Sequence, residues 1–283
     1  MPDKPPRFRL RRLLLLLVIA YASVLLLLRI FESRLIFFPD LPSRLAGDWH
    51  PAGLPLEEVS IQSDDGTKLF AWWIPAESAK FTFLAFHGNA GNISDRAYVD
   101  HFLHEVPVNV LAVEYRGYGK SEGRPAEQEF YRDARVAFRY LVEKRGIDPK
   151  TIISYGQSLG TAIATNLASE TNVGGLVLEA PFPSVSAMAR RVYWFLPGLS
   201  LLAGSQFDTK SKIARVKAPV LVVQCTTDPV IPPDLGHQVY EAGPSQKTLF
   251  QIEMSCHEES SLLAPRRYAV ALREFLAKVE ASK

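Results

Sequence analysis

The sequence predicts an α/β protein in which a mostly parallel sheet is covered by helices on both faces. Short apolar runs typical of buried strands alternate along the chain with longer segments of helical periodicity, a pattern typical of parallel sheets. The 283 residues are 47% hydrophobic and 22% charged, which suits one large core. A formal net charge of +2 indicates no nucleic-acid partner, and two cysteines exclude a disulfide framework or zinc-finger spacing.

The amino terminus predicts a membrane anchor. Segment 1–12 carries five basic residues, which are Lys4, Arg7, Arg9, Arg11 and Arg12. An unbroken apolar run over 13–28 follows, and 13–31 is about the minimum length of a spanning helix. The positive-inside rule keeps 1–12 in the cytoplasm and places the rest in a periplasm or lumen. A cleaved signal peptide is the alternative, because Ala-Tyr-Ala at 20–22 has the form of a processing site. Cleavage there would leave an apolar new terminus, which favours an uncleaved signal anchor.

The rest of the chain divides into a connector over 32–55 and one domain over 56–283. The connector begins with an interfacial segment containing Phe37 and Phe38 and continues as a Pro- and Gly-rich stretch. The domain opens with a hairpin, 59–62 and 69–74, around Asp-Asp-Gly at 64–66. Further strands are expected at 81–86, 108–113, 151–155, 176–178, 220–223 and 248–252. Helices are expected at 93–105, 125–144, from about 159, at 233–242 and at 260–281.

The stretch 151–162 predicts a nucleophile elbow, in which an apolar strand stops at Gly156-Gln157-Ser158-Leu159-Gly160 and continues as an Ala-rich helix. The two glycines would let strand and helix approach closely. Ser158 would then stand at the carboxyl edge of the sheet, over the unpaired N–H groups of the first helical turn. A chance match on a Gly- and Ser-containing turn is the alternative.

A serine nucleophile needs an imidazole to accept its proton and an acid to orient that imidazole. In this architecture the chain order should be Ser, then Asp or Glu, then His, each after a strand. Asp228 follows the strand at 220–223 and His257 follows the strand at 248–252, so both meet this order. Glu179, at the end of another strand, is the alternative acid, although it is more typical of a structural carboxylate.

An oxyanion hole needs two backbone donors, one after the serine and one after the third strand. Leu159 provides the first and, by spacing, Asn89 the second, while His87 is expected to brace the loop. His101 and His104 have one-turn helical spacing but no carboxylate or cysteine companion, so no metal site is expected.

Together these motifs resemble the α/β-hydrolase superfamily. The resemblance is carried by His-Gly-Asn-Ala-Gly-Asn at 87–92, the Gly-rich segment 115–123, the elbow, Asp-Pro-Val-Ile-Pro at 228–232 and His257. Within the superfamily it points to single-pass membrane-anchored serine hydrolases of the depalmitoylase and serine-aminopeptidase-like branch. The resemblance implies the α/β-hydrolase fold, a triad of Ser158, Asp228 and His257, and no cofactor. For 116–123 it implies a structural loop, whereas the local composition equally suits a solvated turn.

Two departures from the family pattern involve cysteine. Gln224-Cys225 stands where relatives usually have His-Gly, and Cys256 stands where a small residue usually precedes the histidine. A triad would bring these loops together, and the expected compartment is oxidising, so a Cys225–Cys256 disulfide is one hypothesis. Two buried free thiols are the other.

Segment 181–208 is too long for a plain connection and too apolar for a solvated loop. We expect a cap over Ser158 that receives an acyl or other apolar group of a small-molecule or acylated substrate. Packing of this segment on the sheet is the alternative.

These observations predict a serine hydrolase that cleaves an ester or thioester through an acyl-enzyme. A peptidase on the same fold and a non-catalytic membrane-tethered binding module are the alternatives.

Overall fold

The computed structural model describes residues 6–282, in which one eight-stranded sheet forms the centre of the molecule. Its strands are β1 (Glu57–Gln62), β2 (Lys68–Ile74), β3 (Thr82–Phe86), β4 (Asn109–Val113), β5 (Ile152–Gln157), β6 (Gly175–Glu179), β7 (Val220–Thr227) and β8 (Lys247–Ser255). Their order is β1-β2-β4-β3-β5-β6-β7-β8. The pairs β1–β2 and β2–β4 are antiparallel and the other five are parallel, which confirms the predicted sheet with its antiparallel hairpin.

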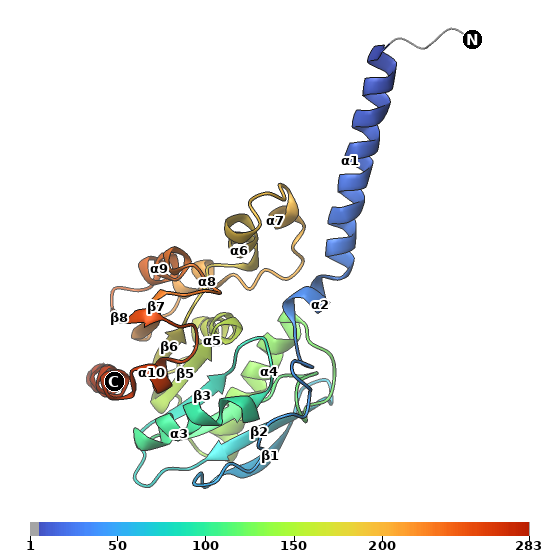
Figure 1. The fold of residues 1–283 in the computed structure, drawn as a ribbon. Coiled ribbons are helices and arrows are strands. Elements are labelled where there is room, and N and C mark those ends of the chain that lie inside the picture. Colours follow the sequence, from blue (N-terminus) through green and yellow to red (C-terminus); the bar gives the residue numbers. More distant parts are fainter. Residues whose placement is uncertain (1–5, 283) are drawn as a thin grey trace.

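Helices cover both faces of this sheet (Figure 1). One face packs against α4 (Glu127–Arg139), α5 (Leu159–Glu170), α8 (Thr209–Ile213) and α9 (Pro233–Ala242). The other packs against α3 (Ala97–Glu105), which follows the 3-10 turn Ile93–Arg96, and against α11 (Pro265–Ala281). Neighbouring residues of one strand serve opposite faces, since Ile152 joins the first cluster and Ile153 the second. Burial on both faces explains why these strands are continuously apolar.

Two predicted helices differ from the observed ones. The segment expected as one helix over 260–281 is broken into α10 (Ser260–Leu263) and α11, because Pro265 lacks the N–H that a continuous helix requires and instead begins α11. The helix expected over 125–144 begins at Glu127, since Ala126 is extended, and it ends in a π-helical turn, Tyr140–Lys144.

Helix α1 (Pro6–Ile30) projects away from the domain (Figure 1). Within the described residues it is the one helix long and apolar enough to cross a membrane, over Leu10–Ile30, and its apolar side chains are exposed. The first five residues of the predicted basic segment, including Lys4, lie outside the described residues. Helix α2 (Glu32–Ile36) follows, and Phe37 then enters the core against Phe130, so packing of the domain begins within 32–55.

Candidate active site

Ser158 lies on the sharp turn between β5 and α5. Its backbone has φ 48° and ψ −113°, a conformation that residues other than glycine rarely adopt. The chain on either side is tightly packed, because a Cβ on Gly156 would overlap the carbonyl of Gly160, and a Cβ on Gly160 would overlap the carbonyl of Phe86 in β3. The Ser158 N–H donates to the carbonyl of Glu179 at 2.9 Å, which ties the turn to β6.

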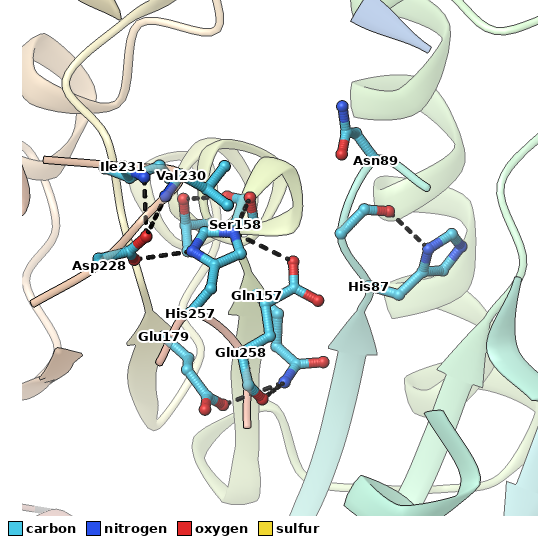
Figure 2. Close-up of polar contacts among 12 residues, drawn as sticks. His87, Asn89, Gln157, Ser158, Glu179, Asp228, Val230, Ile231, His257 and Glu258 are labelled. Atoms are coloured by element: carbon cyan, nitrogen blue, oxygen red, sulfur yellow. Dashed lines mark hydrogen bonds and ion pairs between the residues drawn. The ribbon is translucent and has the colours of Figure 1, made fainter. Parts of the chain in front are cut away.

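The structure brings together Ser158, Asp228 and His257 (Figure 2). The Nε2 atom of His257 lies 3.0 Å from Ser158 Oγ, and its Nδ1 lies 2.7 Å from Asp228 Oδ2. The other oxygen of Asp228 accepts the N–H groups of Val230 at 2.7 Å and Ile231 at 2.8 Å. These bonds occupy Oδ1, and Oδ2 accepts from the imidazole.

Neighbouring strands deliver the acid and the histidine to one place, because β7 and β8 are parallel and adjacent. Asp228 follows β7, and His257 follows β8 after Cys256. Cys225 in β7 and Cys256 form a disulfide with a Cα–Cα separation of 5.6 Å, so of the two cysteine hypotheses the structure has the bonded one. The Cys256 N–H also donates to the carbonyl of Thr227 at 3.0 Å, which further joins the two loops.

The His257 pKa results from opposing influences. Burial alone would lower it, but the hydrogen bond to Asp228 and the negative charges of Glu258, Asp228 and Glu259 outweigh burial, so the pKa is raised above its ordinary 6.5. A higher pKa makes the imidazole a stronger base toward the serine hydroxyl.

The two predicted oxyanion donors are Leu159, at the start of α5, and Asn89, in the loop after β3. Leu159 opens α5, so its N–H has no preceding helical turn to bind. Asn89 lies in the loop after β3, where its carbonyl accepts the Tyr118 hydroxyl at 2.9 Å and the Phe38 N–H at 3.1 Å. Its side-chain amide donates to the Ile36 carbonyl at 2.9 Å, so neighbouring segments hold the loop on several sides.

The His87 side chain holds this loop in place through hydrogen bonds and ring packing. Its Nδ1 lies 2.7 Å from the Gly88 carbonyl oxygen and its Nε2 lies 3.1 Å from Glu114 Oε1. The ring stacks against Tyr115, whose hydroxyl donates to the His87 carbonyl at 2.6 Å. Both ring nitrogens are thus engaged away from Ser158, as the bracing hypothesis expects.

Glu179, the alternative acid, is a buried carboxylate with other partners. It accepts the Tyr155 hydroxyl at 2.7 Å, the Gln157 side-chain amide at 3.1 Å and the Ser260 N–H at 3.1 Å. Burial raises its pKa to about 7 against the opposing effect of those hydrogen bonds. Its bonds join β5, β6 and α10, which is a structural role.

Glu258 is a site residue that sequence reasoning missed. Its Oε1 lies 3.6 Å from His257 Nε2 (Figure 2). Its Oε2 accepts a hydrogen bond at 3.1 Å from the half-buried guanidinium of Arg96. The same carboxylate packs against Gly88, where a Cβ would overlap it. The available signal was the acidic pair 258–259 directly after the histidine, but no sequence pattern pairs it with Arg96.

Segment 116–123 is a structural loop rather than a solvated turn. The Arg116 guanidinium is buried and donates to Asp133 through two nitrogens, each at 2.6 Å. It also pairs with Asp65 at 2.9 Å and Glu129 at 2.6 Å. This cluster joins the loop to the hairpin turn and to α4. Across the described residues, no group of three or more metal-ligating side chains is found.

Segment 181–208 forms helices α6 (Val185–Val192) and α7 (Leu199–Leu202) and leaves large apolar side chains in the open. Trp194 is 78% exposed and Leu201 is 84% exposed, whereas Phe182 and Phe207, at the two ends of the segment, are buried. The ends of the segment therefore pack on the domain, and its middle projects outward.

Comparisons with known proteins bear on the family and the fold. The family model described as serine aminopeptidase, S33, matches residues 77–207, which include Ser158 and the loop after β3 but end before Asp228 and His257. An uncharacterized protein of Mycobacterium tuberculosis is 35% identical over 250 residues, covering 87% of this chain and 88% of the relative. The α/β hydrolase domain-containing protein WAV2 of Arabidopsis thaliana is 32% identical, covering 94% of this chain and 93% of the relative. An esterase of Pyrococcus furiosus has the same fold, with a TM-score of 0.70, 21% identity and coverage of 83% of this chain and 97% of its own.

Proposed function

Because this chain belongs to the α/β-hydrolase superfamily, we propose that it is a membrane-anchored serine hydrolase that cleaves an ester or thioester of an acyl substrate. The relatives and the family-model match over 77–207 support a hydrolase, and the model's description supports the serine-aminopeptidase-like branch. The observation that carries the finer proposal is the continuous relay from Ser158 Oγ through His257 to Asp228.

The proposed reaction proceeds in two halves. In the first, His257 Nε2 accepts the proton of the Ser158 hydroxyl while Oγ attacks the substrate carbonyl carbon, and Asp228 stabilises the imidazolium. The N–H groups of Leu159 and Asn89 bind the resulting oxyanion. His257 then returns its proton to the leaving alkoxide or thiolate, and an acyl-enzyme remains. In the second half, His257 takes a proton from water as the water oxygen attacks the acyl carbon. The bond from the acyl carbon to Ser158 Oγ then breaks, His257 returns the proton to Oγ, and the acid is released.

Amide cleavage is the second candidate, because the matching family model describes a serine aminopeptidase. An amine is a poorer leaving group than an alkoxide or thiolate, so comparison of matched ester and amide substrates separates the two activities. A non-catalytic binding module is disfavoured, since such a module has no need of three polar groups aligned at 2.7 and 3.0 Å.

The membrane part of the proposal rests on α1. We assign 1–12 to a cytoplasmic segment, 13–31 to an uncleaved signal anchor, 56–283 to the hydrolase domain outside the cytoplasm and 181–208 to its cap. The full chain should remain in membranes after alkaline extraction. A processed protein that lacks residues 1–22 and is released by alkali would support the signal-peptide alternative instead.

Labelling with a fluorophosphonate probe tests the chemistry. The full chain is placed in phospholipid nanodiscs, and wild type is compared with Ser158→Ala and His257→Ala. Wild type should be labelled, and neither variant should be. The rate of ester turnover should fall at least roughly 10⁴-fold in each variant, as expected for groups that act as a unit. Absence of labelling in folded wild-type protein, or equal labelling of Ser158→Ala, would contradict the proposed mechanism.

A further inference from the structure

A cavity of about 390 Å³ lies between the end of the anchor helix and the cap, and we name it the anchor–cap cavity. Leu28 of α1 and Leu35 of α2 line one side, and Met188, Ala189 and Leu199 of the cap line the other. The volume falls within the range of ligand-binding pockets. The lining is predominantly apolar, which suits a hydrocarbon group.

The cavity lies at the catalytic end of the sheet. Two of its lining residues, Ile36 and Phe38, are hydrogen-bonded to Asn89 in the oxyanion loop after β3. Its opposite wall belongs to α6, which follows β6. Strands β3 and β6 are the two neighbours of β5, which ends at Ser158. One wall is therefore hydrogen-bonded to the loop after β3, and the other follows β6, so each is joined to a strand next to β5. Figure 1 shows α2, α6 and α7 at this end of the molecule.

The same cavity adjoins the helix that we assign to the membrane anchor. The Tyr21 hydroxyl of α1 donates to the Pro197 carbonyl at the tip of the cap, at 2.5 Å. Tyr21 lies nine residues before Ile30, so this contact is about 13 Å up the helix from the end of the apolar span. The cap tip therefore reaches alongside the spanning helix, at a depth where the exposed Trp194 and Leu201 would meet lipid.

The polar groups at the rim of the cavity already have partners. Glu32 accepts the N–H groups of Gly204 at 2.9 Å and Ser205 at 2.8 Å, and it pairs with Arg29 at 2.8 Å. These bonds fasten the cap to the chain that leaves the anchor. The charges of Arg29 and Glu32 are therefore already paired, and neither favours a polar ligand in the cavity.

We propose that the anchor–cap cavity holds the acyl chain of the substrate, which enters sideways from the bilayer while its carbonyl reaches Ser158. The end of α1 is then a wall of the substrate site as well as a tether. This inference rests on the proposed function and adds to it the place where the chain binds.

The first test measures how kcat/KM depends on the length of the acyl chain. The substrates are p-nitrophenyl esters from acetate to dodecanoate, and the full-length protein is held in nanodiscs. Each methylene that enters the cavity should raise kcat/KM roughly four-fold. Leu28→Trp, from the anchor, and Ala189→Trp, from the cap, should each exclude several methylenes. If four methylenes are excluded, the ratio of kcat/KM for decanoate to kcat/KM for acetate would fall about 250-fold. Arg190→Trp is the matched control, because Arg190 is exposed on α6 and does not line the cavity.

A second readout is independent of turnover. An alkyl diazirine acyl analogue is photolysed in the Ser158→Ala protein, and labelled peptides are mapped. Labelling of the peptides containing Leu35 or Met188, reduced by Ala189→Trp and retained in Arg190→Trp, would support the cavity. Absence of such labelling, or an unchanged chain-length ratio in both tryptophan variants, would overturn it. Failure of every ester to react despite mapped labelling would overturn the hydrolase proposal and leave the acyl site standing.

Discussion

Removal of the Cys225–Cys256 disulfide should destabilise the domain by about 3.7 kcal/mol at 25 °C. The bond closes a loop of sequence separation 31, and the chain-entropy relation for a loop of that length gives this value. Both cysteines are buried, and buried free thiols behave as small hydrophobic groups, so reduction need not disturb the folded core. The loss of loop-closure entropy is therefore expected to appear in the free energy of unfolding.

The same perturbation should lower activity, because the disulfide joins the two loops of the candidate triad. Cys256 immediately precedes His257, and Cys225 lies three residues before Asp228. The hydrogen bond from Cys256 N–H to the Thr227 carbonyl remains after reduction, so the loops would shift rather than separate. We expect kcat to fall roughly ten- to hundred-fold, the cost of a misplacement of up to about 1 Å.

Urea unfolding, followed by the fluorescence of the fully buried Trp72, measures the stability change with and without a phosphine reductant. The double variant Cys225→Ala/Cys256→Ala is the control, since its unfolding should resemble that of reduced wild type and should not respond to the reductant. Equal free energies of unfolding for oxidised and reduced wild type would refute the reasoning.

Three other perturbations have defined outcomes. Glu258→Gln should move the acid limb of the kcat/KM–pH profile to lower pH. The Glu258 charge raises the His257 pKa against the effect of burial, and only the neutral imidazole accepts the serine proton, so loss of the charge extends activity to lower pH. An acid limb at the wild-type pH would count against this role of Glu258. Asp133→Ala should cost about 3 kcal/mol in urea unfolding by leaving Arg116 buried without its bidentate partner, and a loss below about 1 kcal/mol would contradict it. Gly160→Ala should cost at least about 1–3 kcal/mol and lower kcat, since its Cβ would overlap a β3 carbonyl; wild-type kinetics and stability would show that the elbow tolerates a side chain.

Local patterns in the sequence were sufficient for the sheet and for the order of the proposed triad. Continuous apolar runs mark strands buried on both faces, and parallel strands place their carboxyl ends at one edge, so Ser158, Asp228 and His257 could be expected together from their positions after strands. The break before α11 shows the limit of periodicity, because Pro265 interrupts a pattern that otherwise continues through both helices.

Tertiary packing decided what local pattern does not encode. The pair of Glu258 with Arg96 joins residues 162 positions apart, and the bonds of Glu32 to the cap span 172 and 173 positions. The sequence left disulfide and free thiols as alternatives, because a bond depends on the separation of Cα atoms in two different loops. Strand order and motif chemistry are thus properties of short segments. The distances that create the anchor–cap cavity and surround His257 with charge depend on how those segments pack in three dimensions.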